Sequence, residues 1–556
     1  MGPLIVQGDK TLLLEVAHPQ AEETRQAIAP FAELERAPEH IHTYRLTDLG
    51  LWNARAAGHT STEVCQTLVK YTRYPIPPNV LTDIAEVMDR YGRLTLERDG
   101  DQLVLRTTDQ AVLREVQRSK QTKGLLGAQL SDTEVTVPNG ARGALKQALV
   151  KLGWPADDQA GFVDGTPHPI ALSQLAPPRG EGAGPAQAAR PWRLREYQRQ
   201  AVDAAWFGGS GVVVLPCGAG KTVVGAGVMA KTSATTLILV TNTVAARQWR
   251  DELLRFTTLR PEEIGEYSGA RKEIKPITIA TYQVMTTKRD GAFVHLDLLD
   301  GQDWGLIVYD EVHLLPAPIF RLTADLQARR RLGLTATLVR EDGREDEVFS
   351  LIGPKRYDAP WKEIEAQGHI APAVCTEVRL TLPDDLRLAC ATAEPNERYR
   401  LAATAPDKTA IVRRLVEEHP DDQVLVIGAY LSQLEDLSEA LDAPLITGQT
   451  PVRERERLYA AFRTGEVALL VVSKVANFSI DLPEASVAIQ VSGSFGSRQE
   501  EAQRLGRIMR PKADGRVAHF YTVVSRDTPD QEFAGHRQRF LAEQGYSYRI
   551  IDAEDL

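Results

Sequence analysis

The chain has 556 residues, well beyond the length at which one hydrophobic core stops growing, so about three or four structural units are expected. Its 43% hydrophobic and 25% charged residues are typical of a globular protein, and no segment approaches the roughly 18 consecutive apolar residues of a membrane-spanning helix. A net charge of −10 argues against a generally basic protein but allows a local groove that neutralises phosphates.

The cysteines and the N-terminal segment indicate a cytoplasmic protein. Cys65, Cys217, Cys375 and Cys390 are scattered and form no C-x-x-C pair, which favours reduced thiols over a metal cluster. The first ten residues, MGPLIVQGDK, lack the basic-then-apolar layout of a signal peptide, so we expect no targeting segment there.

Residues 1–175 are predicted to form a mixed α+β region. Its long helical stretch covers residues 47–90. A second helical segment, 109–123, carries four basic residues and is either a DNA-facing surface or, as we favour, a solvated helix face. The expected strands are 3–7, 11–16, 93–98 and 102–107, and the basic residues are Arg114, Arg118, Lys120 and Lys123.

A linker and two α/β lobes are expected next. Residues 176–191 are rich in Pro, Gly and Ala, with almost no large apolar residue to bury. The following runs are short, apolar and β-branched, and helical patterns separate them, as in parallel sheets covered by helices. They fall into two groups, which predict a first lobe at 192–368 and a second at 369–556. The runs are 211–216, 236–241, 277–281, 305–311, 423–428, 468–473 and 486–492.

The segment PCGAGKT predicts a phosphate-binding loop, because it lies between an apolar strand and a helical run. Gly218 and Gly220 allow backbone amides to curl around phosphate oxygens, and the helix N-terminus adds its positive end. Lys221 is expected to reach the β- and γ-phosphates of ATP, and the Thr222 hydroxyl to bind Mg²⁺. Leu215 stands where the strict motif has a further glycine. Pro216, Cys217 and Ala219 complete the predicted ATP-binding loop.

The segment GLIVYDEVH supplies the carboxylates that this chemistry needs. Asp310 suits a Mg²⁺ ligand, and Glu311 can orient or activate the attacking water. His313 is either a buried structural histidine or, as its place in DEVH favours, a link between the nucleotide and the nearby TAT element.

These motifs, in this order, resemble those of superfamily 2 helicases, together with LREYQ at 194–198, GLTAT at 333–337 and QRLGRIMR at 503–510. The resemblance implies that Arg195 and Gln198 lie near adenine, and that Thr335 and Thr337 couple hydrolysis to nucleic acid. It also implies that Gln503, Arg507 and Arg510 reach the ATP from the second lobe. Arginine suits this role because its fixed charge can stabilise the transferring phosphoryl group.

Within that superfamily the chain resembles the XPB family of DNA helicases, over nearly its whole length. Arg340, Glu341 and Asp342 follow TAT, at the place where that family carries its R-E-D element. The resemblance implies a role for them in strand separation. Without the preceding TAT, they would be interpreted as a charged surface turn. Residues 472–512 and 537–548 are also similar. The thumb-like insertion, expected near 382–408, looks short, which would weaken strand separation without affecting ATP hydrolysis.

Loops after the predicted strands supply candidate DNA contacts, in which hydroxyls and amides would grip phosphates without reading bases. Several of these residues are alternatively helix caps. Asn477, with Phe478, departs from the glycine-rich pattern of many superfamily members. The candidates are Thr243, Arg247, Thr281, Tyr282, Ser473, Asn477 and the segment 494–498.

The sequence therefore predicts a DNA-stimulated ATPase that uses Mg²⁺ and acts on single-stranded or forked DNA. The resemblance implies 3′ to 5′ unwinding in a repair process like nucleotide excision repair, association with the nucleoid, and a nuclease or repair factor as a possible partner. Two alternatives stay open: a motor that moves along duplex DNA or acts on RNA without separating DNA strands, and a nucleotide-gated DNA-binding scaffold.

Overall fold

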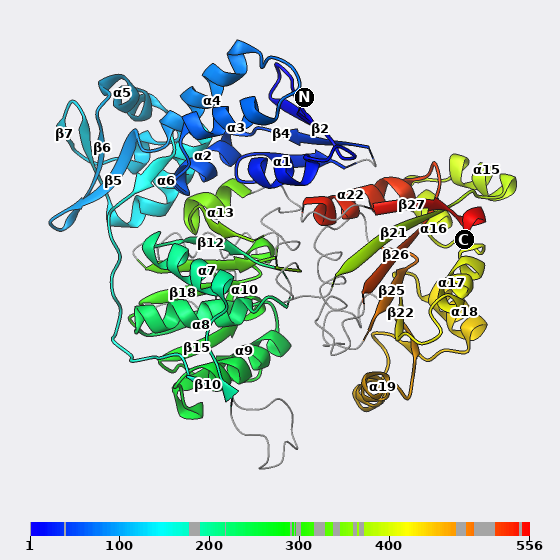
Figure 1. Cartoon of the computed structure of the whole chain (residues 1–556). Coiled ribbons are helices and arrows are strands. Elements are labelled where there is room, and N and C mark those ends of the chain that lie inside the picture. Colours follow the sequence, from blue (N-terminus) through cyan, green and yellow to red (C-terminus); the bar gives the residue numbers. More distant parts are fainter. Residues whose placement is uncertain are drawn as a thin grey trace.

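The structure is a computed structural model. It describes residues 2–37, 40–176, 190–216, 218–289, 292–293, 295, 302–315, 329–336, 345–359, 364–365, 372–473, 485–493, 517–543 and 548–556. Figure 1 shows an N-terminal region in blue and cyan that lies along a green first lobe, with the yellow-to-red second lobe beside them. Among the described residues, no helix combines the length and apolar character needed to cross a bilayer.

The N-terminal region contains two sheets. The first is antiparallel, in the order β1-β2-β4-β3, and the second has the order β7-β8-β6-β5-β9. The expected helix over 47–90 is three helices, because Thr60 and Pro77 each start a new one; Thr60 forms a capping box with Glu63. The strands are β1 Leu4–Val6, β2 Thr11–Glu15, β3 Glu33–Arg36, β4 Ile41–Arg45, β5 Leu94–Asp99, β6 Gln102–Thr107, β7 Gln129–Ser131, β8 Glu134–Val137 and β9 Ala156–Asp158. The helices are α1 Ala21–Ile28, α2 Asp48–Ala56, α3 Ser61–Tyr71, α4 Pro78–Arg90, α5 Gln110–Arg118 and α6 Arg142–Leu152.

Helix α5 lies in the segment 109–123, which was interpreted either as a solvated helix face or as a DNA-facing surface. Its apolar residues, Val112, Leu113 and Val116, are buried, while Arg114 and Arg118 are exposed. Both a solvated face and a DNA-facing surface are compatible with this arrangement.

The first lobe is a parallel sheet in the order β14-β15-β13-β18-β19-β12-β20. The apolar runs predicted as strands form its centre, where both faces are covered, so every residue of β13 is buried. Its strands are β12 Gly211–Val214, β13 Thr236–Val240, β14 Ile264–Tyr267, β15 Ile277–Thr281, β18 Leu306–Asp310, β19 Arg330–Thr335 and β20 Lys355–Asp358. Its helices are α7 Glu196–Phe207, α8 Lys221–Thr232, α9 Thr243–Phe256, α10 Tyr282–Thr286 and α13 Glu345–Leu351.

The second lobe repeats this plan, with the order β23-β24-β22-β25-β26-β21-β27 and parallel pairing throughout. Its strands are β21 Ala373–Leu380, β22 Val424–Gly428, β23 Leu445–Ile446, β24 Leu469–Ser473, β25 Val487–Gln490, β26 Ala518–Ser525 and β27 Tyr548–Asp552. Its helices are α15 Asp384–Thr392, α16 Pro395–Ala403, α17 Lys408–Glu417, α18 Leu431–Leu441, α19 Val452–Thr464 and α22 Pro529–Glu543. The expected fold class, two RecA-like lobes after a mixed α+β region, is confirmed.

Two connecting regions add detail to the expected organisation. The chain already pairs with the first lobe before residue 175, through bridges from Pro167 to Ala234 and from Leu172 to Thr257. Short strands β10 Leu175–Ala176 and β11 Arg190–Pro191 then pair across the segment expected to be a linker. Helices α15 and α16 occupy the region expected to hold a thumb, which stays a prediction.

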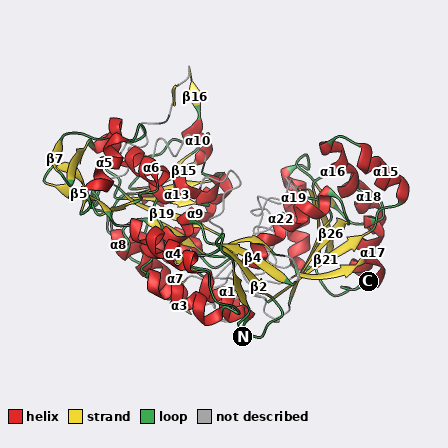
Figure 2. Ribbon diagram, turned by 90° about the horizontal axis from the view of Figure 1, so that it is seen from above, coloured by secondary structure: helices red, strands yellow, loops and turns green. Residues whose placement is uncertain are grey.

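Viewed from above, the two lobes lie on opposite sides, with β2 and β4 of the N-terminal region near the middle (Figure 2). Strand β3 contacts α22, so the N-terminal region touches both lobes.

Candidate ATP and DNA site

The phosphate-binding loop connects β12 to α8, as the sequence predicts. Gly218 and Gly220 have φ angles of 81° and 82°, a left-handed conformation that glycine adopts without steric cost. A Cβ at Gly220 would lie 2.6 Å from Gln198 Nε2, so the close approach of α7 also requires glycine there. Lys221 and Thr222 begin α8, where free backbone amides and the helix dipole favour an anion.

The loop is held from behind by α7. Both the Tyr197 hydroxyl and Gln198 Nε2 donate hydrogen bonds to the Ala219 carbonyl, at 2.8 and 2.9 Å. Gln198 Oε1 accepts from the Arg195 backbone amide at 3.0 Å, and Arg195 Nη1 donates to the Tyr197 hydroxyl at 3.1 Å. The two residues expected near adenine therefore also support the loop.

Asp310 and Glu311 lie at the carboxyl end of β18, beside the phosphate-binding loop. The Glu311 carboxylate forms an ion pair of 2.9 Å with Lys221 Nζ, and both side chains are largely buried. Asp310 Oδ2 accepts a hydrogen bond of 3.0 Å from Trp249 Nε1, and the Asp310 carbonyl accepts one of 2.7 Å from the Tyr282 hydroxyl. Helices α9 and α10 thus position the end of β18.

A chain of polar contacts leads from Lys221 to β19. His313 Nδ1 lies 3.6 Å from Glu311 Oε2 and 2.6 Å from Thr335 Oγ1, and both His313 and Thr335 are buried. Glu311 has a φ angle of 48°, uncommon for a residue with a side chain. The structure thus brings together the phosphate-binding loop, DEVH and the TAT element.

Burial and charge shift the two carboxylates in opposite directions. Burial, reinforced by the negative charge of Glu311, raises the pKa of Asp310. Burial also acts to raise the pKa of Glu311, but Lys221 and then His313 outweigh it, so that pKa is lowered. The pair therefore holds one firmly ionised carboxylate and one whose negative charge is poorly compensated, which a divalent cation would relieve.

The residues present fit ATP with Mg²⁺. The loop offers inward-turned backbone, a lysine and a helix N-terminus to phosphate oxygens, and Asp310 and Thr222 offer the oxygen ligands that Mg²⁺ prefers.

Three candidate DNA contacts on the first lobe differ in exposure. Thr243 and Arg247 are exposed on α9, and the cap of this helix is Asn242, whose side chain accepts from the Ala245 amide at 2.9 Å. Tyr282, by contrast, is buried against Asp310. Its hydroxyl therefore holds the backbone carbonyl of Asp310, and the side chain does not lie on the exposed surface.

Two further candidates are also buried. Thr281 lies at the end of β15 and makes no capping hydrogen bond to α10. Ser473 Oγ is buried at the end of β24 and has no hydrogen-bond partner among the described residues.

The remaining candidates lie outside the described residues, and their roles stay predictions. They are Cys217, Thr337, Arg340, Glu341, Asp342, Asn477, the segment 494–498, Gln503, Arg507 and Arg510.

Sequence reasoning missed Trp249 and Tyr197. Tyr197 lies within the LREYQ motif, but only Arg195 and Gln198 of that motif were singled out; Trp249 lies two positions after Arg247 and belongs to no nucleotide-binding pattern. Only the packing of α9 and α7 against the ends of β18 and β12 brings their polar atoms to the site.

Comparison with known proteins gives matches along most of the chain. The family described as "ERCC3/RAD25/XPB C-terminal helicase" matches residues 364–555. "Type III restriction enzyme, res subunit" matches 192–340, and "Helicase conserved C-terminal domain" matches 4–131.

Full-length relatives are also similar. "DNA 3'-5' helicase XPB" of Kineococcus radiotolerans is 67% identical over all of this chain and 97% of the relative. The protein of the same description from Mycobacterium tuberculosis is 64% identical over all of this chain and 98% of the relative. "General transcription and DNA repair factor IIH helicase/translocase subunit XPB" of Antonospora locustae is 31% identical, covering 99% of this chain and 82% of the relative.

Proposed function

Because the chain belongs to the XPB family of helicases, we propose that it is an ATP-dependent DNA helicase that unwinds in the 3′ to 5′ direction and acts in DNA repair. The proposed ATPase activity rests mainly on one observation, the series of contacts that runs from Lys221 through Glu311 and His313 to Thr335. The proposed direction of unwinding and the proposed role in repair rest on the names of the relatives.

ATP would bind with its phosphates in the loop of Gly218 to Thr222. Lys221 would neutralise the β- and γ-phosphates, while Glu311 would orient the attacking water and accept its proton. Asp310 and Thr222 would hold Mg²⁺, which supplies charge stabilisation on the phosphate oxygens. Arg507 and Arg510 would complete the site from the second lobe, and Gln503 lies on the same segment.

Hydrolysis would be transmitted to DNA through His313 and Thr335. Their 2.6 Å hydrogen bond joins the end of β18 to the end of β19, which leads into Thr337 and the R-E-D residues. A change at Glu311 on loss of the γ-phosphate would therefore alter the segment proposed to contact DNA. Arg340, Glu341 and Asp342 are proposed to act at the fork, and Thr243, Arg247, Ser473 and Asn477 to contact the DNA backbone.

The protein is proposed to act in the cytoplasm, on DNA of the nucleoid, and a nuclease or another repair factor is its proposed partner. The DNA repair subunit among its relatives supports this role.

ATP turnover measured without nucleic acid, then with single-stranded DNA, duplex DNA and RNA, tests the proposal. Single-stranded or forked DNA is expected to stimulate turnover most. Lys221→Ala should lower stimulated turnover by about 100-fold, because a charge-stabilising group at the phosphates is lost. Lys231→Ala, on the same helix but partly exposed and paired with Asp203, is the matched control and should retain turnover.

Other outcomes would support a different function. Stimulation by duplex DNA alone would indicate a duplex translocase, and stimulation by RNA alone an RNA-directed enzyme. Wild-type turnover equal to that of Lys221→Ala would indicate a nucleotide-gated scaffold.

A further inference from the structure

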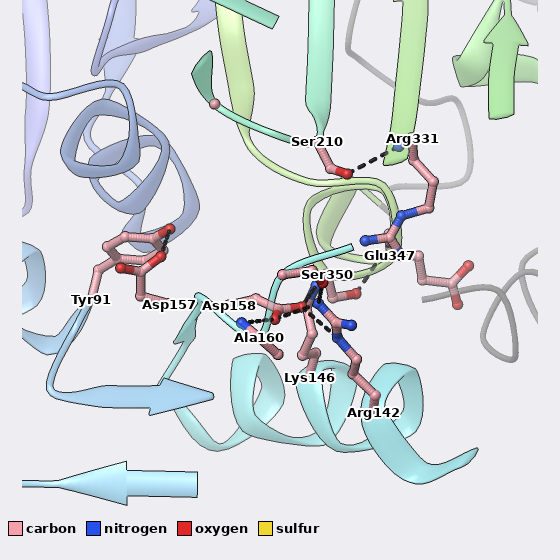
Figure 3. Close-up of polar contacts among 12 residues, drawn as sticks. Tyr91, Arg142, Lys146, Asp157, Asp158, Ala160, Ser210, Arg331, Glu347 and Ser350 are labelled. Carbon is pink, nitrogen blue, oxygen red and sulfur yellow. Dashed lines mark hydrogen bonds and ion pairs between the residues drawn. The ribbon is translucent and has the colours of Figure 1, made fainter. Parts of the chain in front are cut away.

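A buried charge cluster joins the N-terminal region to the first lobe, far along the sheet from the ATP site. Asp158, after α6, accepts hydrogen bonds from Arg142 at 2.7 and 3.0 Å and from Lys146 at 2.9 Å. Arg331, near the start of β19, approaches the cluster from the first lobe (Figure 3). All three cations are at least nine-tenths buried.

Part of the Arg331 guanidinium lacks a hydrogen-bond acceptor among the described residues. Its side chain is 2% exposed, and neither Nε nor Nη1 has a hydrogen-bond partner among the described residues. Arg142 Nη1 is also buried without a partner there. A buried guanidinium without acceptors is strongly destabilising, so such groups are normally paired.

The nearby carboxylates are already occupied. Both oxygens of Asp158 accept from Arg142, and one also accepts from Lys146. The oxygens of Asp157 accept from the Tyr91 hydroxyl at 3.3 Å and from Gln159 at 2.7 Å. Neither carboxylate accepts a hydrogen bond from Arg331.

A fourth cation adds to the excess. Arg356 donates only to backbone carbonyls, those of Ser210, Ala56 and Gly208, which satisfy its hydrogen atoms but not its charge. Four cations therefore surround two carboxylates. The cations are Arg142, Lys146, Arg331 and Arg356, and the carboxylates are Asp157 and Asp158.

A cavity of about 40 Å³ lies among these groups, lined by Arg331, Lys146 and Arg356 together with Asp158, Ser350 and Tyr91. Glu347, which Figure 3 draws near the cluster, does not line this cavity. One water needs roughly 10 to 15 Å³ by this measure, so the cavity holds about three waters or one small inorganic ion, and no nucleotide.

We propose that this cavity is a binding site for one small inorganic anion, of the size of chloride or sulfate, which joins the N-terminal region to the first lobe. The anion would accept from Arg331 and offset the surplus positive charge. Its ligands would come from both parts of the chain, so binding would stabilise their contact. Burial is the main cause of the lowered pKa of Arg331, about 10, which fits a buried cation whose charge an anion would offset.

Thermal unfolding of the full chain tests the site without any ATP readout. Chloride or sulfate replaces gluconate, an anion too large for the cavity, at constant ionic strength. The wild-type midpoint should rise saturably by about 2 to 4 °C, because the anion binds the folded state. Arg331→Met keeps the length of the side chain without its charge and should abolish the saturable rise. The control Arg457→Met, at an exposed arginine of α19, should behave as wild type.

An equal saturable rise in Arg331→Met would overturn the proposal. Wild-type crystals soaked in bromide give a second measurement that does not depend on the folding of the variant. An anomalous peak within hydrogen-bond distance of Arg331 would support the site. Ordered water alone in the cavity, or an adventitious ion only at the surface, would overturn it.

Discussion

Asp310 shows how residues outside the motifs position a carboxylate that is proposed to hold Mg²⁺. Trp249 from α9 holds one carboxylate oxygen, and Tyr282 from α10 holds the backbone carbonyl. This leaves the other carboxylate oxygen, Oδ1, to meet a cation. Groups that orient a metal ligand commonly change metal affinity by about 10- to 100-fold when they are removed.

Trp249→Phe should therefore raise the Mg²⁺ concentration for half-maximal ATP turnover by about tenfold, because the ring still fills its place while the N–H is lost. A titration of turnover against Mg²⁺ measures this, and Mg²⁺-dependent nucleotide binding gives a readout separate from turnover. Trp206→Phe, on α7, is the control. An unchanged Mg²⁺ requirement in Trp249→Phe would mean that its hydrogen bond does not position Asp310.

The protonation state of His42 is expected to affect the stability of the N-terminal region. It is buried on β4, and burial lowers its pKa from 6.5 to about 4. Between pH 6.5 and 4 the unfolded chain takes up a proton at this residue while the folded chain does not. Stability contributed by neutral His42 is therefore present above pH 6.5 and lost as the pH falls to about 4, by up to ~3 kcal/mol.

His42→Gln should flatten this part of the pH dependence. Denaturant unfolding of the full chain between pH 7 and 4 measures it, and His59→Gln, at a partly exposed histidine, is the control. A slope equal to that of the wild type in His42→Gln would assign the pH dependence to other groups.

At the scale of elements, α13 ties the motor to the N-terminal region. It follows the R-E-D residues, packs on α6, and places Phe349 in the hydrophobic core of the N-terminal region, edge-on to Tyr91 at 6.2 Å. Asn53 Oδ1 accepts a hydrogen bond of 3.0 Å from the Lys355 backbone amide. The helix that follows the segment proposed to separate strands is thus anchored to the N-terminal region.

Phe349→Ala should destabilise the protein by about 3 kcal/mol, because it leaves a cavity in that core. The expected result is a lower unfolding midpoint together with faster amide exchange in α13 and α6. Phe207→Ala, at an aromatic residue that is 81% exposed, is the control and should have little effect. Unchanged exchange in α6 would show that Phe349 does not join the two parts.

Strands such as β13 and β22 were predictable because they are buried on both faces and their sequences are continuous apolar runs. Other strands of the two lobes were missed: β19, β21 and β26, which lie inside the sheets, and the edge strands β14, β20, β23 and β27. The sequence of β20 is KRYD, which is half exposed at the sheet edge and carries no apolar signal. Strand β27 lies at the corresponding edge of the second lobe.

The residues of the candidate site also include some that the sequence could predict and some that it could not. Lys221, Asp310 and Glu311 were predictable because phosphate and Mg²⁺ require these groups at strand ends. The burial of Tyr282 was not, since its role depends on how α10 packs against β18. No local pattern could have indicated that Arg331 meets Arg142 and Lys146 of α6, because they lie far apart along the chain.

At the scale of the whole molecule, two similar sheets and an accessory region touching both lobes provide the parts of a motor. The contact series from Lys221 to Thr335 lies within the first lobe, so nucleotide state can change that lobe first. Arg507 and Arg510 would add the second lobe when ATP binds, and repeated closure would move the chain along a strand.

Strand displacement on forked DNA with a single-stranded tail of either polarity tests the helicase most directly, with wild type and Glu311→Gln compared under the same conditions. The wild type should displace the strand when the motor loads on a 3′ tail, and Glu311→Gln should bind the fork without displacing it. Equal displacement from 5′ and 3′ tails, or none while ATP is hydrolysed, would contradict a 3′ to 5′ helicase.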